Sequence, residues 1–151
     1  MKSIYRIERQ TYAQLWPSQG ALYGEGRWNR KGFWVIYCSE SVALAKLETL
    51  ANSKSLPSSR VLLEIEVDDK APIKRIVPAD LPDNWMQVPY PKELHVLTER
   101  WLQDQQYVGL QIPSRQSPQE DNYLLYPLHP QFSQWVRVLH RTPIEFDQRL
   151  K

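Results

Sequence analysis

Three side chains in the first third of the sequence are of types that could bind and act on a small substrate: Arg27, Tyr37 and Glu48. Arg27 lies between Gly20 and Gly32, in a segment that holds four of the five glycines and therefore predicts a long loop. Long loops inside compact domains are usually functional or mobile. An arginine fork can bind a pyrophosphate or a carboxylate through paired hydrogen bonds, whereas a solvated surface arginine is the simpler interpretation.

Tyr37 lies in the continuous apolar run over residues 33–38, which is typical of a buried strand. An aromatic residue in such a strand usually packs in the core, with its hydroxyl hydrogen-bonded to a neighbour. The functional alternative is a stacking platform for a flat ring such as nicotinamide or a base. The strand pattern leaves both interpretations open.

Glu48 falls on a helix predicted over residues 42–52, for which Ser39 or Ser41 would be the N-cap. The apolar residues of this helix recur at helical spacing and are expected to face one side: Ala43, Leu44, Leu47, Leu50 and Ala51. Glu48 lies at the border of that side, where a carboxylate without a partner is unfavourable. Both an ion pair with an arginine and a carboxylate facing a catalytic cleft fit this position.

Other residue types argue against several kinds of chemistry. The histidines His95, His129 and His140 lack metal-ligand spacing, and Cys38 is the only cysteine, so neither a metal site nor a disulfide is predicted. His95 is expected to be a surface or packing residue of a helix. Neither a glycine-rich phosphate-binding motif nor the serine elbow of α/β-hydrolases occurs. Ser114 follows a proline and is expected to cap a turn.

The remaining patterns predict an α+β domain. Residues 60–67 alternate apolar and polar side chains, as in a half-buried strand, and residues 92–105 carry a helical stripe of Leu94, Leu97 and Trp101. Shorter strands are expected over residues 4–7, 108–112, 123–125 and 135–139, and an irregular proline-rich segment over 72–91. Because strands and helices do not alternate regularly, we expect a compact single domain over residues 1–151, with small mixed or antiparallel sheets and flanking helices.

Length and composition fit a protein with one core. The 151 residues carry 19 Lys and Arg against 17 Asp and Glu, a net charge of +2, which is too small to indicate nucleic acid by itself. No stretch approaches the roughly 18 apolar residues of a membrane span, and the first residues lack the apolar run of a signal peptide. A soluble, cytoplasmic protein is therefore expected.

Four segments, in order along nearly the whole chain, together resemble the RES domain, the toxin half of a bacterial toxin–antitoxin pair. The segments are Gly24-Glu25-Gly26-Arg27-Trp28-Asn29, Tyr37-Cys38-Ser39-Glu40-Ser41 with Leu47-Glu48, Leu81-Pro82-Asp83-Asn84-Trp85, and Ile112-Pro113-Ser114 with Glu120-Asp121-Asn122-Tyr123. No single segment is specific, but their order is strong support for the resemblance.

The resemblance implies a fold related to ADP-ribosyltransferases and an enzyme that degrades NAD, as a glycohydrolase or a phosphorylase, by cleaving the nicotinamide–ribose bond. NAD is then the substrate, and no further cofactor is expected. The resemblance assigns Arg27, Tyr37 and Glu48 to the catalytic site, with Ser114 and Asn122 close to the substrate. Glu48 would stabilise an oxocarbenium-like transition state, Arg27 would hold the pyrophosphate or ribose, and Tyr37 would stack on nicotinamide. Ser114 would hydrogen-bond the substrate or orient Glu48.

The resemblance also implies a protein partner, an antitoxin of the Xre helix-turn-helix type that blocks the cleft. A homodimer is compatible with the same family. No contact with a membrane is expected, and nucleic acid would be reached only through the antitoxin.

Two other functions stay open at this point. An ADP-ribosyltransferase that modifies a protein or nucleic acid would need the same NAD cleft, and only the acceptor would differ. An RNA-binding or RNA-cleaving toxin has the basic isoelectric point, about 8.7, and six tryptophans in its favour. Against that toxin, the basic residues are scattered and no histidine pair offers a general acid and a general base.

Overall fold

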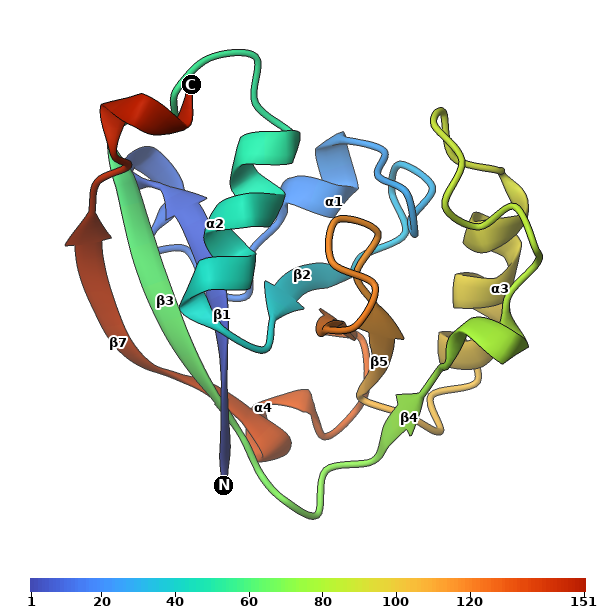
Figure 1. Ribbon diagram of the computed structural model, residues 1–151. Helices are drawn as coiled ribbons and strands as arrows, with labels where there is room; N and C mark the ends of the chain where they lie inside the picture. Colours follow the sequence, from blue (N-terminus) through green and yellow to red (C-terminus); the bar gives the residue numbers. More distant parts are fainter.

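Seven strands form one sheet in the order β4-β5-β6-β2-β1-β3-β7, in a computed structural model that describes residues 1–151 (Figure 1). The strands are β1 (Lys2–Arg9), β2 (Ile36–Ser39), β3 (Arg60–Val67), β4 (Ile73–Arg75), β5 (Gly109–Pro113), β6 (Asp121–Leu125) and β7 (Val136–Ile144). Only β4 and β5 pair in parallel, and every other neighbouring pair is antiparallel. The predicted α+β class is therefore confirmed, with one mixed sheet in place of several small ones.

Four helices and three short turns of 3-10 helix surround the sheet. The helices are α1 (Gly20–Tyr23), α2 (Val42–Ala51), α3 (Glu93–Leu102) and α4 (Phe132–Trp135), and the 3-10 turns are Gln10–Tyr12, Pro78–Asp80 and Gln148–Leu150. Even α2 and α3, with ten residues each, lack the length and apolarity needed to cross a bilayer.

Most predicted elements are present, with different boundaries. The strand over 60–67 has the predicted alternation, because Val61, Leu63, Ile65 and Val67 are buried. The segment from Gly20 to Gly32 is not entirely loop, since it begins with the single turn of α1. Residues 33–35 precede β2 rather than belonging to it. The proline-rich segment contains β4, which the pattern missed because three residues are too few to show a period.

The sheet is joined at its centre by a single residue pair. β1 pairs with β3 along its whole length, and β2 pairs with β6 over all four residues, but β1 and β2 share only Tyr5 with Ser39. Beyond that pair the two halves of the sheet separate. The main-chain carbonyl of Tyr37 therefore has no main-chain partner in β1, and it accepts a hydrogen bond of 3.0 Å from the side chain of Arg6, through Nη1, instead.

Each face of the sheet has its own apolar core. Strand β6 shows the division, because Tyr123 and Leu125 belong to one buried cluster and Leu124 to the other. The first cluster fills the face of β1 and β3 that carries Ile4 and Leu63. The second lies between β5, β6, α3 and the loop that carries Trp28. Neither core covers the face of β1 opposite to Ile4. Helix α2 packs over that face.

Helix α2 packs over β1 and β2 with an inward side that is more polar than the sequence predicts (Figure 1). Ser41 is the N-cap, and its hydroxyl accepts a hydrogen bond of 3.1 Å from the amide of Leu44. The buried residues are Leu44 and Ala45. The expectation for Ala43, Leu47 and Ala51 is wrong, because all three are exposed. Their exposure follows from the position of α2, which covers a polar cavity rather than a core.

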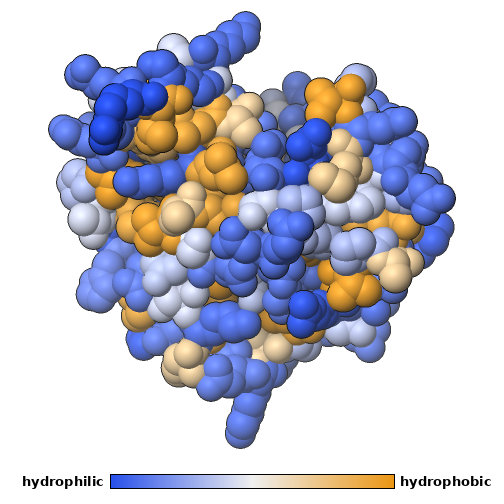
Figure 2. Space-filling view, in the orientation of Figure 1, coloured by the Kyte–Doolittle hydropathy of each residue, from blue (hydrophilic) through white to orange (hydrophobic).

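The surface is mostly hydrophilic, with separate apolar patches (Figure 2). Leu47 on α2 is 41% exposed, and Leu150 in the last 3-10 turn is 51% exposed. Figure 2 shows an apolar patch at the upper left, where Figure 1 places α2 and the C-terminal segment.

Candidate active site

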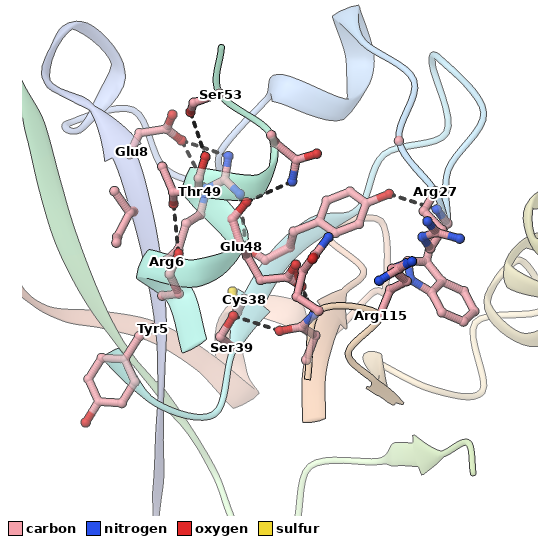
Figure 3. Close-up of a pocket in the computed structure, with 18 of the residues that line it drawn as sticks. Tyr5, Arg6, Glu8, Arg27, Cys38, Ser39, Glu48, Thr49, Ser53 and Arg115 are labelled. Atoms are coloured by element: carbon pink, nitrogen blue, oxygen red, sulfur yellow. Dashed lines mark hydrogen bonds and ion pairs between the residues drawn. The ribbon is translucent and has the colours of Figure 1, made fainter. Parts of the chain in front are cut away.

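A cavity of about 600 Å³ opens where the two halves of the sheet separate, beneath α2 (Figure 3). Its walls include four of the five residues singled out in the sequence: Arg27, Tyr37, Glu48 and Asn122. The fifth, Ser114, has no accessible surface and lies behind Glu48. The fold thus brings together residues from a loop, two strands and a helix that are up to 95 positions apart in the chain (122 minus 27).

Glu48 lies on the side of α2 that faces the cavity, and its partners are neutral side chains. Its Oε2 accepts hydrogen bonds from Nδ2 of Asn122 and, at 3.4 Å, from the hydroxyl of Ser114. Burial raises the pKa of Glu48, while these two hydrogen bonds and the charge of Arg27 lower it in part. Glu48 forms no ion pair in the structure. Of the two interpretations left open by the sequence, the carboxylate facing a cleft is the one that the geometry supports.

Asn122 is held in place by Ser39, a residue that the sequence suggested only as a helix cap. The two residues are direct neighbours in the register of β2 and β6, and the Ser39 hydroxyl donates to Oδ1 of Asn122 at 2.7 Å. Since the carbonyl end of the amide is thereby engaged, its NH₂ group is directed at Glu48. The sequence did contain a signal for a site role of Ser39. Tyr37 and Ser39 are two positions apart in a strand, so both lie on the same face of it.

Ser114 is a turn serine, as predicted. It follows β5, and its hydroxyl oxygen accepts hydrogen bonds of 3.1 Å from the amides of Gln116 and Ser117. The hydroxyl proton remains for Glu48. Because Ser114 is fully buried, the geometry supports orientation of Glu48, and a direct contact with substrate would require Glu48 to move. We refer to Glu48, Asn122, Ser39 and Ser114 as the carboxylate wall.

Tyr37 presents its ring to the cavity while its hydroxyl is bound to the glycine-rich loop. The hydroxyl donates to Oδ1 of Asn29 at 2.5 Å and accepts from the amide of Trp28 at 3.2 Å. Burial raises the pKa of Tyr37 strongly, so the phenol stays protonated. A side chain at Gly26 would place its Cβ 2.6 Å from this hydroxyl, which explains why the loop needs glycine there.

The same loop is braced by two buried polar residues that the sequence did not single out for this role. Asn29 is 1% exposed, and its Nδ2 donates to the carbonyls of Gly24 and Arg30 at 3.1 and 3.2 Å. His95 on α3 is 2% exposed and has Nε2 2.8 Å from the carbonyl oxygen of Gly26. The sequence predicts that His95 is either a surface residue or a packing residue, and it is a packing residue. It contacts the glycine-rich loop at Gly26.

Arg27 lies on the opposite side of the cavity, anchored by main-chain carbonyls. Its Nη1 donates to the carbonyls of Trp85 and Gln87 at 2.8 and 2.9 Å. The guanidinium also lies 5.8 Å from the ring centroid of Tyr90. Burial lowers the pKa of Arg27, and the nearby charge of Arg115 adds to that effect. Arg27 is therefore a half-buried, anchored side chain at the cavity rather than a freely solvated surface arginine.

Arg115 is the second arginine on this side, and the sequence gave no reason to select it. Its Nε donates to the carbonyl of Met86 at 3.1 Å, so one turn of chain holds both guanidinium groups. We refer to Arg27, Arg115 and the turn over residues 85–87 as the arginine wall. Two guanidinium groups placed side by side favour an anionic ligand.

The charges of the cavity suit a negatively charged molecule. Its charged lining comprises five arginines and three glutamates: Arg6, Arg9, Arg27, Arg60, Arg115, Glu8, Glu25 and Glu48. Nowhere in the chain do three His, Cys, Asp or Glu side chains converge. Cys38 also lines the cavity, but burial raises its pKa to about 12, so the thiol is not an activated nucleophile.

Comparison with known proteins shows the family. The model of the RES domain matches residues 3–147. A protein named Toxin Res from Yersinia enterocolitica is 38% identical over 151 residues, which cover 98% of this chain and 99% of that protein. A protein named Prs ADP-ribosylating toxin from Sphingobium is 39% identical over 135 residues, which cover 85% of this chain and 84% of that protein.

The fold is also found among solved structures. A chain of the M. tuberculosis MbcT–MbcA toxin–antitoxin complex matches with a TM-score of 0.73 over 95% of this chain and 84% of its own length. At 14% identity the likeness concerns the fold alone. The family assignment rests on the sequence matches. They show that this chain belongs to the RES domain family and is a RES-domain toxin.

Proposed function

We propose that this toxin degrades NAD by cleaving the bond between nicotinamide and ribose. The observation that carries the proposal is Glu48, a desolvated carboxylate held by neutral donors only and facing two anchored arginines across the cavity. A carboxylate in that setting favours a positive charge developing beside it, and the arginines favour a diphosphate. NAD carries both: a diphosphate, and a ribose that becomes positively charged as the bond breaks.

The reaction follows from the chemistry of the pyridinium group. The bond between C1′ and the pyridinium nitrogen breaks, and its electron pair goes to that nitrogen, which leaves as neutral nicotinamide. C1′ becomes oxocarbenium-like, and the charge of Glu48 stabilises it. An oxygen of water or of phosphate then bonds to C1′ and loses its proton. Because the leaving group is cationic before cleavage, no general acid is needed.

The other residues would bind and orient. The Tyr37 ring would stack on nicotinamide, since its hydroxyl is already hydrogen-bonded to Asn29 and Trp28. Arg27 and Arg115 would hold the diphosphate. Asn122 and Ser114 would keep Glu48 in position.

A second candidate is transfer of ADP-ribose to another molecule, and a specific relative favours it. The Sphingobium protein, 39% identical, is named an ADP-ribosylating toxin. The transfer breaks the same bond, with a nucleophile of the target molecule replacing water or phosphate. The carboxylate wall and the arginine wall would have the same roles in both reactions.

A protein partner is part of the proposal. The structural neighbour is part of a toxin–antitoxin complex, and we propose that an antitoxin of Xre type covers the cavity of this chain in the cytoplasm. A homodimer of the toxin is compatible with that arrangement. Size-exclusion chromatography with light scattering, on the toxin alone and with its antitoxin, would measure both states.

The first experiment is nicotinamide release from NAD by the purified chain, with and without phosphate, next to Glu48→Ala. Release that disappears in Glu48→Ala supports the proposal, and the mass of the second product distinguishes ADP-ribose, its 1-phosphate and an ADP-ribosylated protein. Glu93→Ala is a matched control, because Glu93 is an exposed carboxylate on α3. Near-wild-type release from Glu48→Ala would contradict the mechanism.

A further inference from the structure

The cavity has a second basic end, which the proposed roles of Arg27 and Arg115 do not use. Figure 3 shows Glu48 between two groups: Arg27 and Arg115 on one side, and Arg6, Glu8 and Ser53 on the other. Arg9 and Arg60 line the cavity as well. Both arginines lie near Glu8, whose negative charge favours the charged form of Arg60.

Arg9 and Arg60 face each other across two neighbouring strands. They are direct partners in the register of β1 and β3, where they lie on the face of the sheet that α2 partly covers. Like charges opposite one another in a sheet are unfavourable. Consistent with this, the pKa of Arg60 is lowered, first by burial and then by the charge of Arg9.

This pair has no ion-pair partner, and the charge of Glu8 offsets it only in part. Neither Arg9 nor Arg60 forms an ion pair, and the only hydrogen bond from the Arg60 side chain goes to the main-chain carbonyl of Ser58, at 2.6 Å. The neighbouring Glu8 is already engaged, because its Oε2 accepts a hydrogen bond of 3.0 Å from Nε of Arg6 and forms an ion pair with Nη2 of Arg6 at 3.0 Å. Two guanidinium groups thus remain with free donors at a cavity wall.

We propose that Arg9 and Arg60 bind the acceptor of the reaction, and that this acceptor carries a phosphate group. Asn52 and Ser53, which directly follow α2, are polar residues of the cavity lining, and Figure 3 shows Ser53 near Glu8 at this end. Paired guanidinium groups match the oxygens of a phosphate dianion. The proposal rests on the proposed cleavage of NAD and adds where the second substrate lies, with Glu48 between the two anion sites.

The reaction balances with inorganic phosphate as acceptor. A phosphate oxygen forms a bond to C1′ of the ribose while the bond from C1′ to nicotinamide breaks, and the electron pair leaves on the nicotinamide nitrogen. The hydroxyl proton of the phosphate is lost to solvent. A sugar phosphate would bind through the same dianion and react through a hydroxyl instead.

Steady-state kinetics of Arg60→Gln and Arg9→Gln test the proposal. Nicotinamide release is measured against phosphate concentration at saturating NAD, and against NAD concentration at saturating phosphate. We expect the KM for phosphate to rise at least tenfold more than the KM for NAD. Arg100→Gln is the matched control, an exposed arginine on α3 that is expected to change neither constant. A larger rise in the KM for NAD would overturn the proposal, since this end would then hold part of NAD.

Direct binding separates a failure of this proposal from a failure of the proposed function. Titration calorimetry with inorganic phosphate needs no reaction, and the wild-type chain should bind phosphate while Arg9→Gln and Arg60→Gln bind it at least tenfold more weakly. Equal binding by all three chains would overturn the subsite even if NAD is cleaved. A second titration with ribose 5-phosphate distinguishes a free phosphate from a phosphate on a larger acceptor, and either ligand binding at Arg9 and Arg60 supports the subsite.

Discussion

The carboxylate wall and the arginine wall hold their charged groups by different means. Glu48 is held by side chains, since Asn122 and Ser114 donate to it and Ser39 holds Asn122. Arg27 and Arg115 are held by the main chain, through the carbonyls of residues 85–87. A single substitution can therefore remove each support of Glu48 in turn, whereas the supports of the arginines remain whatever side chains residues 85–87 carry.

The difference has a chemical consequence. The donors around Glu48 are neutral and few, so its charge is only partly compensated and remains available to a cationic transition state. The carbonyls around Arg27 carry partial negative charge that fixes the orientation of the guanidinium without neutralising it. The carboxylate wall is thus suited to stabilising the transition state, and the arginine wall is suited to binding the substrate.

The largest effect is expected for Glu48→Gln. Glutamine keeps the shape and can still accept from Asn122, but it has no charge to stabilise the transition state. We expect kcat for nicotinamide release to fall about 10²–10³-fold, as when a charge-stabilising group is removed, with little change in the Kd of NAD measured by titration. Glu93→Gln serves as the control. A rise in Kd that matched the loss of kcat would assign Glu48 to binding and erase the contrast between the walls.

Arg27→Lys tests the arginine wall. Lysine keeps the charge but lacks the planar fork that bridges the carbonyls of Trp85 and Gln87 while still facing the ligand. We expect kcat/KM for NAD to fall about tenfold to a hundredfold, mainly through KM, which corresponds to about 1.4–2.7 kcal/mol. Arg30→Lys, in the same loop but 59% exposed in its side chain, is the matched control. A fall in kcat alone would count against a binding role.

Asn122→Ala should move the pH profile. The hydrogen bond from Asn122 lowers the pKa of Glu48, so its loss raises that pKa further. Because the proposed reaction needs ionised Glu48, the acid limb of kcat/KM shifts to higher pH, with a loss of up to about tenfold at acidic pH. Ser39→Ala should shift the acid limb of kcat/KM to higher pH as well, but by a smaller amount, because Asn122 can still donate to Glu48. If kcat/KM fell by the same factor at every pH, Asn122 and Ser39 would only support packing.

The smallest effect concerns stability. Burial raises the pKa of Glu48, so its ionised form costs free energy above that pKa, and the cost disappears as the pH falls through it. Glu48→Gln removes the charge and is therefore expected to raise the free energy of unfolding at pH 7 by about 0.5–1 kcal/mol, as is common when a functional group is replaced. Thermal unfolding measured from pH 4 to 8 checks this. A gap between the two proteins that stayed constant over this range would exclude titration of Glu48 as its cause.

Local patterns were sufficient for much of the fold. The alternation over residues 60–67 identified β3 and its buried face, and the two candidate caps Ser39 and Ser41 bracketed the start of α2, of which the structure uses Ser41. They were misleading where an element faces a cavity. The apolar residues Ala43, Leu47 and Ala51 of α2 are exposed, since the side that faces the sheet carries Glu48 and Thr49 for the cavity.

The sequence by itself determined the longer elements, the family, and the candidates Arg27, Tyr37, Glu48 and Asn122, but not the short elements α1 and β4. What the sequence determined depends on short-range periodicity and on the order of motifs, both of which are visible along the chain. Only the tertiary structure decided that Arg115, Ser39 and His95 belong to the same site, and that Ser114 lies behind Glu48. These contacts join segments 29 to 83 positions apart. They depend on strand register and on the separation of β1 from β2, which no local pattern encodes.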